Sequence, residues 1–314
     1  MQQRPGDHVA ILMGLHNGAA FLDAQLASIA AQDHLNWSLI VSDDGSSDTG
    51  PDLLRRFADG PGAGRVTLVQ GPRRGFAQNY LSLLRHPETG QAAYVALSDQ
   101  DDIWLPTRLS RGVAALRDRH ERPALCCART VVCDAALKPL HLSPLWPRAF
   151  SMRNAMVQNV ASGNTILMNR AMADRALKAA PAAQTADIAA HDWWLYLLAT
   201  ATGAAVVQDD HATLQYRQHA ANSMGRNDTL SARFGRMSQI FDGTFARWID
   251  ANCQALSLIE PMLTPEAKAI LSQIPELRAG TAAHRIRTFR AVGLYRQAKS
   301  GTVALMTAAG LRKL

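Results

Sequence analysis

Three carboxylates stand close together behind a short apolar run. Asp99, Asp101 and Asp102 come one residue after the run AYVAL at 93–97. Like charges at this spacing repel one another, and in a cleft of low dielectric constant a cation must neutralise them. Carboxylate oxygens suit Mg²⁺ or Mn²⁺, which also bridge substrate phosphates. An exposed acidic turn is the alternative, but the apolar pair at 103–104 should anchor the segment against a core.

A second pair of carboxylates follows another apolar run. Asp43 and Asp44 come shortly after WSLIV at 37–41 and precede the turn-forming residues GSS at 45–47. One interpretation is that a carboxylate here accepts hydrogen bonds from a nucleobase N–H or from ribose hydroxyls. The other, which this segment alone favours, is an ordinary loop that caps the next helix.

Both acidic segments fall in a repeating pattern of strand and helix signals. Apolar runs predict buried strands at 8–13, 37–41, 66–69 and 93–97. Helical spacing of apolar residues predicts helices within 21–30, 52–57 and 76–84. This alternation predicts an α/β fold with a mostly parallel central sheet flanked by helices, in which ligands bind beyond the carboxyl ends of the strands. The acidic residues lie at those ends.

The rest of the chain divides into two parts. Further strands are expected at 125–132, 164–168, 204–207 and 212–216, and further helices at 107–119 and 191–200. Strand signals fade after about residue 225, so we expect a catalytic domain over 1–225 and a helical, basic C-terminal extension over 226–314. Between 278 and 314 the sequence holds eight Arg and Lys and no acidic residue.

Composition narrows the class of protein. The chain has 314 residues, 47% of them hydrophobic, and a net charge of +7. The apolar content excludes a disordered chain, and four Cys, expected as buried thiols, are too few for a disulfide scaffold. No apolar stretch reaches the roughly 18–20 residues of a membrane span, and the N-terminus lacks the pattern of a signal peptide. We therefore expect a cytoplasmic protein whose positive charge favours an anionic partner.

Several motifs together resemble family 2 glycosyltransferases of the GT-A fold. The first four are His16-Asn17-Gly18, VSDDGSSD at 41–48, GFAQNY at 75–80 and LSDQDDIW at 97–104, which holds the DxD element. Later segments agree with this resemblance. ASGNT at 161–165 is similar to the glycine turn beside the donor sugar, and HDWW at 191–194 is similar to the acceptor-side element. YRQH at 216–219, with Asn222 and Gly225, is similar to the closing motif of a rhamnosyltransferase or surface-polysaccharide subgroup.

The resemblance implies roles for the matching residues. Asp101 would bind a divalent metal, Mn²⁺ or Mg²⁺, with Asp99 and His219 as further metal candidates. Asp192 would be the catalytic base, with His191 as the alternative because an ordinary imidazole titrates nearer neutral pH. The residues expected to contact the donor are Asn17, Asp43, Asp44, Gly75, Asn79, Asp99, Gly163, Asn164 and Arg217. The candidates for stacking on sugar rings, with core packing as the alternative, are Trp104, Trp193 and Trp194.

These features predict a metal-dependent, inverting glycosyltransferase in cell-surface polysaccharide synthesis. It would move a sugar, rhamnose by resemblance to the subgroup, from a nucleotide-diphosphate donor to a saccharide or lipid-linked acceptor. A nucleotidyltransferase, or another nucleotide-binding protein without transferase activity, is the alternative, but nucleotidyltransferases usually carry a Gly-rich loop and a Lys where this chain has GLHN at 14–17. A nucleic-acid-binding protein should interleave aromatic residues with Lys and Arg, and aromatic residues make up only 6% of the chain.

The basic C-terminal region contains apolar residues among its arginines. They are Ile286, Phe289, Val292, Leu294 and Tyr295. One interpretation is an amphipathic helix that docks on anionic lipid at the inner face of the plasma membrane, which would suit a lipid-linked acceptor. The other is a basic helix that packs on the catalytic domain.

Overall fold

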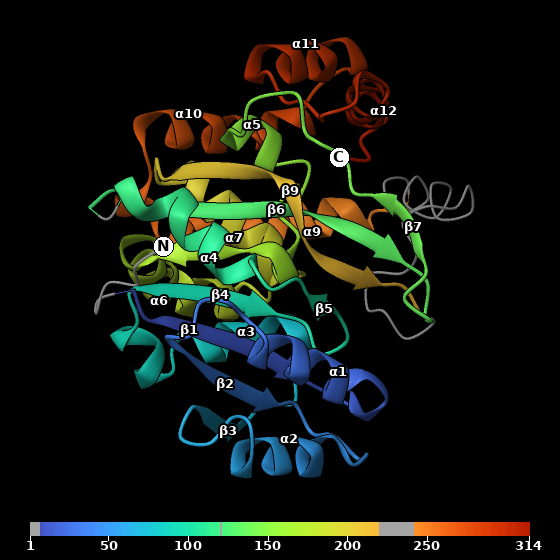
Figure 1. The fold of residues 1–314 in the computed structure, drawn as a ribbon. Coiled ribbons are helices and arrows are strands. Elements are labelled where there is room, and N and C mark those ends of the chain that lie inside the picture. Colours follow the sequence, from blue (N-terminus) through green and yellow to red (C-terminus); the bar gives the residue numbers. More distant parts are fainter. Residues whose placement is uncertain (1–6, 120, 220–241) are drawn as a thin grey trace.

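The computed structural model describes residues 7–119, 121–219 and 242–314, and these form a nine-stranded sheet flanked by helices (Figure 1). Eight strands follow the order β3-β2-β1-β4-β8-β6-β9-β5, and β7 pairs with β6 beside this path. The first four strands are parallel to one another: β1 (Val9–Leu15), β2 (Trp37–Asp43), β3 (Val66–Gln70) and β4 (Tyr94–Ser98). The crossover helices are α1 (Ala19–Ala30), α2 (Gly50–Asp59) and α3 (Phe76–Leu84), with the 3₁₀ turn η1 (Pro87–Gln91) before β4.

Burial on both faces explains why the central strands read as continuous apolar runs. In β1, Ile11 and Met13 pack into the core beneath α1, α2 and α4, whereas Ala10 and Leu12 pack into the core beneath α3, α6 and α7. Alternate side chains of a strand point to opposite faces, so a central strand covered on both faces needs apolar residues at every position. The α/β fold class expected from the sequence is confirmed.

Beyond β4 the sheet becomes mixed. The strands here are β5 (Ile103–Trp104), β6 (Ala124–Cys133), β7 (Pro139–Leu142), β8 (Leu167–Asn169) and β9 (Ala205–Arg217). β8 runs antiparallel to β4 and β6, and β9 runs parallel to β6. The strand expected at 164–168 is wrong in its first half, which is the 3₁₀ turn η3 (Gly163–Thr165). The two strands expected at 204–207 and 212–216 are one strand with an irregularity between them.

Four further helices complete the part of the chain before residue 219 in the described structure. They are α4 (Arg108–Leu116), followed by η2 (Arg117–Arg119), α5 (Met152–Ala155), α6 (Arg170–Thr185) and α7 (His191–Ala201). The sequence analysis missed α6 because alanines, not large apolar residues, form its buried face. Asn169 caps this helix by accepting a hydrogen bond from the backbone N–H of Met172.

The C-terminal helices extend the core of the catalytic part. They are α9 (Thr244–Leu258), α10 (Pro265–Gln273), α11 (Ala282–Val292) and α12 (Lys299–Gly310), with the 3₁₀ turns η4 (Glu260–Met262) and η5 (Pro275–Leu277). Phe245 of α9 stacks on Trp193 of α7 with ring centroids 5.7 Å apart. Figure 1 places α11 and α12 at the end of the molecule opposite to α2 and β3. The boundary expected at residue 225, with Asn222 and Gly225, lies outside the described residues.

The apolar residues of α11 face the protein. Phe289, Val292 and Leu294 are 2–4% exposed and belong to the core that continues through α7. Arg285 is also buried and donates to the carbonyl oxygens of Ala309 and Gly310 at the end of α12. Three of the five apolar residues considered for lipid contact are therefore part of the core, which favours the interpretation of a basic helix that packs on the rest of the protein. Within the described residues, no helix is both long and apolar enough to cross a membrane.

Candidate functional site

The acidic residues behind β4 form a compact cluster. Asp99, Asp101 and Asp102 place one carboxylate oxygen each within 4.8 Å of the others. Asp102 is fully buried, and its two oxygens accept hydrogen bonds from Asn164 Nδ2 at 2.6 Å and from the Arg217 backbone N–H at 3.2 Å. Burial, followed by the charges of Asp99 and Asp101, raises the pKa of Asp102 well above its usual range. The cluster therefore favours a bound cation.

Asp99 lies against Tyr80 of α3. The Tyr80 hydroxyl lies 2.5 Å from the Ser98 carbonyl oxygen and 3.2 Å from Asp99 Oδ1, and can donate to either. Burial is the largest cause that raises the pKa of Asp99, to about 7, and the charges of Asp101 and Asp192 add to it. The contribution of Asp192 places this carboxylate, remote in sequence, in the neighbourhood of Asp99.

The end of β9 reaches the cluster. His219 Nε2 lies 2.8 Å from Asp101 Oδ2, and Arg217 Nε donates to the Asp101 carbonyl oxygen at 3.0 Å. Arg217 also lies over the ring of Phe21, 4.6 Å from its centroid, and His219 packs on the same ring. Both residues from the YRQH motif are thus brought to the cluster, where His219 offers a nitrogen beside three carboxylates.

Asp43 and Asp44 at the end of β2 have different surroundings. Asp44 accepts hydrogen bonds from the backbone N–H groups of Arg73 at 2.6 Å and Gly75 at 2.8 Å, so its oxygens hold the loop before α3. Asp43 Oδ1 accepts from the backbone N–H of Ser46 at 2.9 Å. The structure therefore gives Asp44 a clear role in positioning the loop, and Asp43 is the better placed of the two for a ligand.

The other residues expected on the donor side orient neighbouring loops. Asn17 Oδ1 accepts from the Ser47 backbone N–H at 2.8 Å, which joins the loops after β1 and β2. Asn79 is buried and its Nδ2 donates to the Ser42 carbonyl oxygen at 2.9 Å. Gly75 precedes α3 with a φ of 86°, a conformation that favours glycine.

Asp192 lies at the first turn of α7, beside η3. Its Oδ2 accepts from the Gly163 backbone N–H at 3.1 Å, and its Oδ1 accepts from the Trp193 backbone N–H at 2.7 Å. A Cβ at position 163 would lie 3.0 Å from His191 Nε2, so a larger residue here would crowd the His191 ring. The structure thus brings Gly163, Asn164 and Asp192 to the side of the acidic cluster.

His191 is enclosed in the protein. Its ring stacks on Tyr80 with centroids 3.9 Å apart, and neither ring nitrogen has a partner among the described residues. Burial lowers the pKa of His191 to about 4, although the charge of Asp192 opposes this shift. An imidazole that is enclosed and weakly basic favours Asp192 as the base.

The three tryptophans considered for sugar stacking are core residues. Trp104, Trp193 and Trp194 are at most 6% exposed. Trp193 Nε1 donates to the Ala155 carbonyl oxygen, and Trp104 lies beneath the guanidinium of Arg108. The expectation that they stack on a sugar is not supported for these buried rings.

Sequence reasoning missed two residues that hold the site together. Arg108 is buried, and its Nη2 donates to the carbonyl oxygens of Leu97 at 2.9 Å and Asn164 at 2.7 Å, which joins β4 to η3. Gln100 exchanges two hydrogen bonds with the backbone of His16, at 2.8 and 3.0 Å. The sequence feature related to Gln100 is the glycine at position 18. A Cβ there would lie 2.5 Å from Gln100 Oε1.

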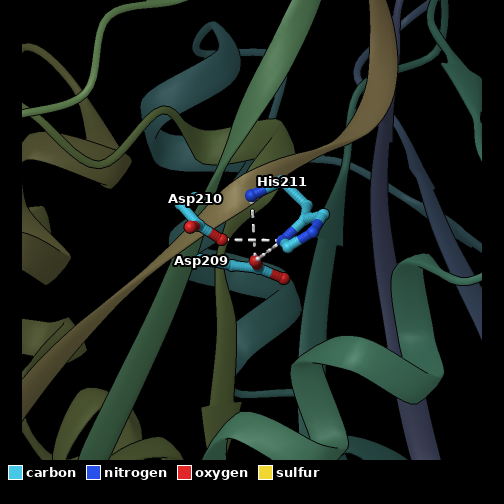
Figure 2. A group of neighbouring side chains, drawn as sticks. All are labelled: Asp209, Asp210 and His211. Carbon is cyan, nitrogen blue, oxygen red and sulfur yellow. Dashed lines mark hydrogen bonds and ion pairs between the residues drawn. The ribbon is translucent and has the colours of Figure 1, made fainter.

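A second acidic group lies farther back along β9. Asp209, Asp210 and His211 occupy the irregular part of this strand, and Figure 2 shows the His211 ring near both carboxylates. Asp209 is held by Arg111 through two hydrogen bonds of 2.7 Å each, which lower its pKa although burial acts in the opposite direction. At ~3.3 Å per strand residue, this group lies roughly 20 Å from Arg217. We assign it to strand packing.

The sheet, the carboxylates behind β2 and β4 and the facing turn η3 define a glycosyltransferase of the GT-A fold. The model of the family described as Glycosyl transferase family 2 matches residues 10–179, more than half of the chain. The protein therefore belongs to glycosyltransferase family 2, as the sequence resemblance predicted.

Three similar proteins illustrate this relationship. The dTDP-rhamnosyl transferase RfbG of Shigella flexneri is 24% identical over 250 residues, covering 78% of this chain and 84% of RfbG. The Escherichia coli enzyme WfgD is a UDP-Glc:alpha-D-GlcNAc-diphosphoundecaprenol beta-1,3-glucosyltransferase. It is 28% identical over 109 residues, covering 34% of this chain and 40% of WfgD. The solved mannosyltransferase PcManGT of Pyrobaculum calidifontis, in complex with GDP-Man and Mn²⁺, has a TM-score of 0.51 and 19% identity, covering 98% of this chain and 85% of PcManGT.

Proposed function

We propose that the enzyme moves a sugar from a nucleoside-diphosphate donor to a hydroxyl group of a saccharide or lipid-linked acceptor, in polysaccharide synthesis at the cytoplasmic side of the membrane. The observation that carries this proposal is the cluster of Asp99, Asp101 and Asp102 within 4.8 Å, with Asp192 close enough to raise the pKa of Asp99. The cluster can bind the diphosphate of the donor through a cation, while Asp192 would face the reacting sugar.

A divalent metal, Mn²⁺ or Mg²⁺, fits the donor atoms of the cluster. Asp101 and Asp99 would hold it, and the His219 nitrogen 2.8 Å from Asp101 is a further candidate ligand. Hard oxygen ligands with several neighbouring negative charges match this class of cation. When bound, the metal would neutralise charge on the leaving diphosphate. The Mn²⁺ and GDP-Man in the solved mannosyltransferase support this choice.

Asp192 is the proposed base. It takes the proton of the acceptor hydroxyl while the hydroxyl oxygen bonds to the anomeric carbon of the sugar. The bond from that carbon to the diphosphate breaks, and its electron pair leaves with the diphosphate. This single in-line displacement inverts the anomeric centre. The N–H groups of Gly163 and Trp193 hold one Asp192 oxygen each and fix its direction.

The donor would lie along the loops that border the acidic cluster and Asp192. Asp43 and Asn17 stand near the loops after β1 and β2, where they can serve the nucleoside. Asn164 and Arg217 both hydrogen bond to Asp102, and Arg217 can add positive charge on the phosphate side. Gly75, Asn79 and Asp44 would act through the shape of the loop before α3.

A donor panel tests the proposal. The purified enzyme with Mn²⁺ is incubated with thymidine-, uridine- and guanosine-diphosphate sugars, and release of the nucleoside diphosphate is measured. We expect turnover of the thymidine-diphosphate rhamnose, because RfbG is a dTDP-rhamnosyl transferase, and loss of turnover in EDTA. Absence of turnover with every donor would contradict the proposal. Transfer of the nucleotide instead of the sugar would support the nucleotidyltransferase alternative.

A further inference from the structure

Most residues of the segment 138–149 are exposed. Every residue of β7 is exposed, so neither face of this strand is covered by the residues that the structure describes. Leu140, Leu142 and Leu145 are 44%, 50% and 48% exposed. Leu140 and Leu142 lie two positions apart on the strand and therefore share one of its faces. Three large apolar side chains so close together on a surface indicate a binding role.

This apolar segment borders the metal-site candidate. β7 pairs with β6 over Val131–Cys133, and the other side of the same part of β6 pairs with the end of β9. Arg217 Nη1 donates to the Ala135 carbonyl oxygen at 2.6 Å in the turn before β7, while its Nε donates to Asp101. One side chain thus joins the turn before β7 to the acidic cluster.

The same segment also adjoins the basic C-terminal region. The guanidinium of Arg148 lies 3.8 Å from the ring centroid of Tyr295 and donates to the Arg296 carbonyl oxygen at 3.0 Å. These two residues lie in the connection between α11 and α12. Figure 1 shows β7 and α12 on the same side of the molecule, and the extended connection that leads from β7 to α5 passes close to the C-terminal helices.

The charged residues of this segment and of the C-terminal residues 278–314 are all positive. The sequence has no acidic residue over 135–150 or 278–314. Exposed cations in these segments are Lys138, Arg148, Arg287, Arg290, Lys299, Arg312 and Lys313. Exposed apolar residues bordered by unbalanced positive charge suit the interface of an anionic bilayer, where apolar side chains enter the acyl boundary and cations contact headgroups.

We propose that the segment 138–149 and the exposed cations of α11 and α12 form a docking surface for a bilayer that contains anionic phospholipid. The leucines of β7, rather than the buried apolar residues of α11, enter the membrane. This inference deepens the proposed function, since it would bring the acidic cluster to the surface where a lipid-linked acceptor resides.

Vesicle sedimentation tests the docking surface. The full chain is mixed with vesicles of phosphatidylcholine alone or with added phosphatidylglycerol. We expect binding only to the anionic vesicles, with at least about tenfold weaker binding for Leu140→Ser/Leu142→Ser/Leu145→Ser and for Arg287→Glu/Arg290→Glu/Lys313→Glu. Matched controls are Leu35→Ser/Leu258→Ser, which alter equally exposed leucines elsewhere, and Arg55→Glu/Arg56→Glu on α2, and these should bind like the wild type.

Three outcomes would overturn the proposal: failure of the wild type to bind anionic vesicles, wild-type binding by both test variants, or equal weakening in the controls. Light scattering detects the competing occupant, a second copy of this chain. A wild-type dimer that the leucine variant converts to a monomer would assign the surface to self-association. Because vesicle binding needs no donor, it is independent of the donor panel, and a cooperative urea unfolding curve for each variant shows that it is folded.

Discussion

The imidazole of His191 lies flat on the ring of Tyr80, with an angle of 16° between the rings and 3.9 Å between their centroids. Tyr80 in turn places its hydroxyl at the Ser98 carbonyl and Asp99. His191, which belongs to the expected acceptor-side element HDWW, is therefore packed beneath the acidic cluster. His191 and Asp192 are neighbours in sequence, yet only Asp192 accepts hydrogen bonds at the site.

Replacement of His191 separates packing from proton transfer. His191→Phe keeps a ring against Tyr80, and we expect turnover within a few-fold of the wild type. His191→Ala leaves a cavity and should lower the free energy of unfolding by about 2–4 kcal/mol, as large-to-small core changes do. Urea unfolding and initial rates measure both effects. A loss of turnover in His191→Phe as deep as in Asp192→Asn would show that the imidazole itself takes part in the reaction.

Burial of His191 also predicts a pH dependence of stability. Its pKa is about 4 in the folded protein against 6.5 as the ordinary value, so the unfolded chain binds the proton more readily. The free energy of unfolding should therefore fall as pH decreases from about 6.5 to 4, by up to roughly 3 kcal/mol at 1.4 kcal/mol per pKa unit. Urea unfolding of wild type and His191→Phe across this range checks it, since the variant should lack this part of the loss. Parallel curves would contradict the prediction.

Removal of one carboxylate from the cluster should weaken metal binding. Asp101→Asn keeps the size of the side chain but loses the charge, and we expect Mn²⁺ affinity to fall by at least about 10–100-fold, the scale seen when residues that only support metal ligands are altered. Titration calorimetry measures the affinity. Turnover in EDTA, with and without restored Mn²⁺, tests whether the reaction requires the metal. Asp59→Asn, at an exposed position on α2, is the control. An unchanged affinity would remove Asp101 from the metal site.

Asp192→Asn should separate donor binding from transfer. The amide oxygen can still accept from the Gly163 N–H, so the turn η3 should keep its geometry. Without a carboxylate to take the hydroxyl proton, transfer should fall by about 10²–10⁴-fold, while donor affinity stays close to that of the wild type. Calorimetry with the donor and single-turnover rates distinguish the two quantities. Near-normal transfer would rule out Asp192 as the base.

The adjacent residues Asp43 and Asp44 should respond differently to substitution. Asp44→Ala leaves the N–H groups of Arg73 and Gly75 without their acceptor and should lower the free energy of unfolding by about 1–3 kcal/mol. Asp43→Asn should leave stability nearly unchanged and raise the KM for the donor. Thermal unfolding and donor titrations measure both. Equal stability losses at the two positions would contradict the difference that the structure shows.

The sequence predicted most of the framework because its signals are local. Apolar runs of four to six residues predicted β1, β2, β3 and β4 with small shifts at their ends. The alanine-rich helix α6 escaped prediction because its burial depends on the helices around it, not on large apolar residues of its own. The pattern predicts a strand over 164–168, but its first two residues belong to the turn η3, because a buried segment alone does not distinguish the two.

The sequence by itself determined the class of the protein, its family motifs and the residues at the strand ends that could do chemistry. Only the tertiary structure decided which oxygens are already engaged, as in Asp44, and which aromatic rings are core, as in Trp194. It also buried the apolar face of α11 and left Leu140 and Leu142 exposed. The physical reason is that these outcomes depend on contacts between distant segments, such as Arg217 with Asp101, 116 positions apart, and no local pattern records them.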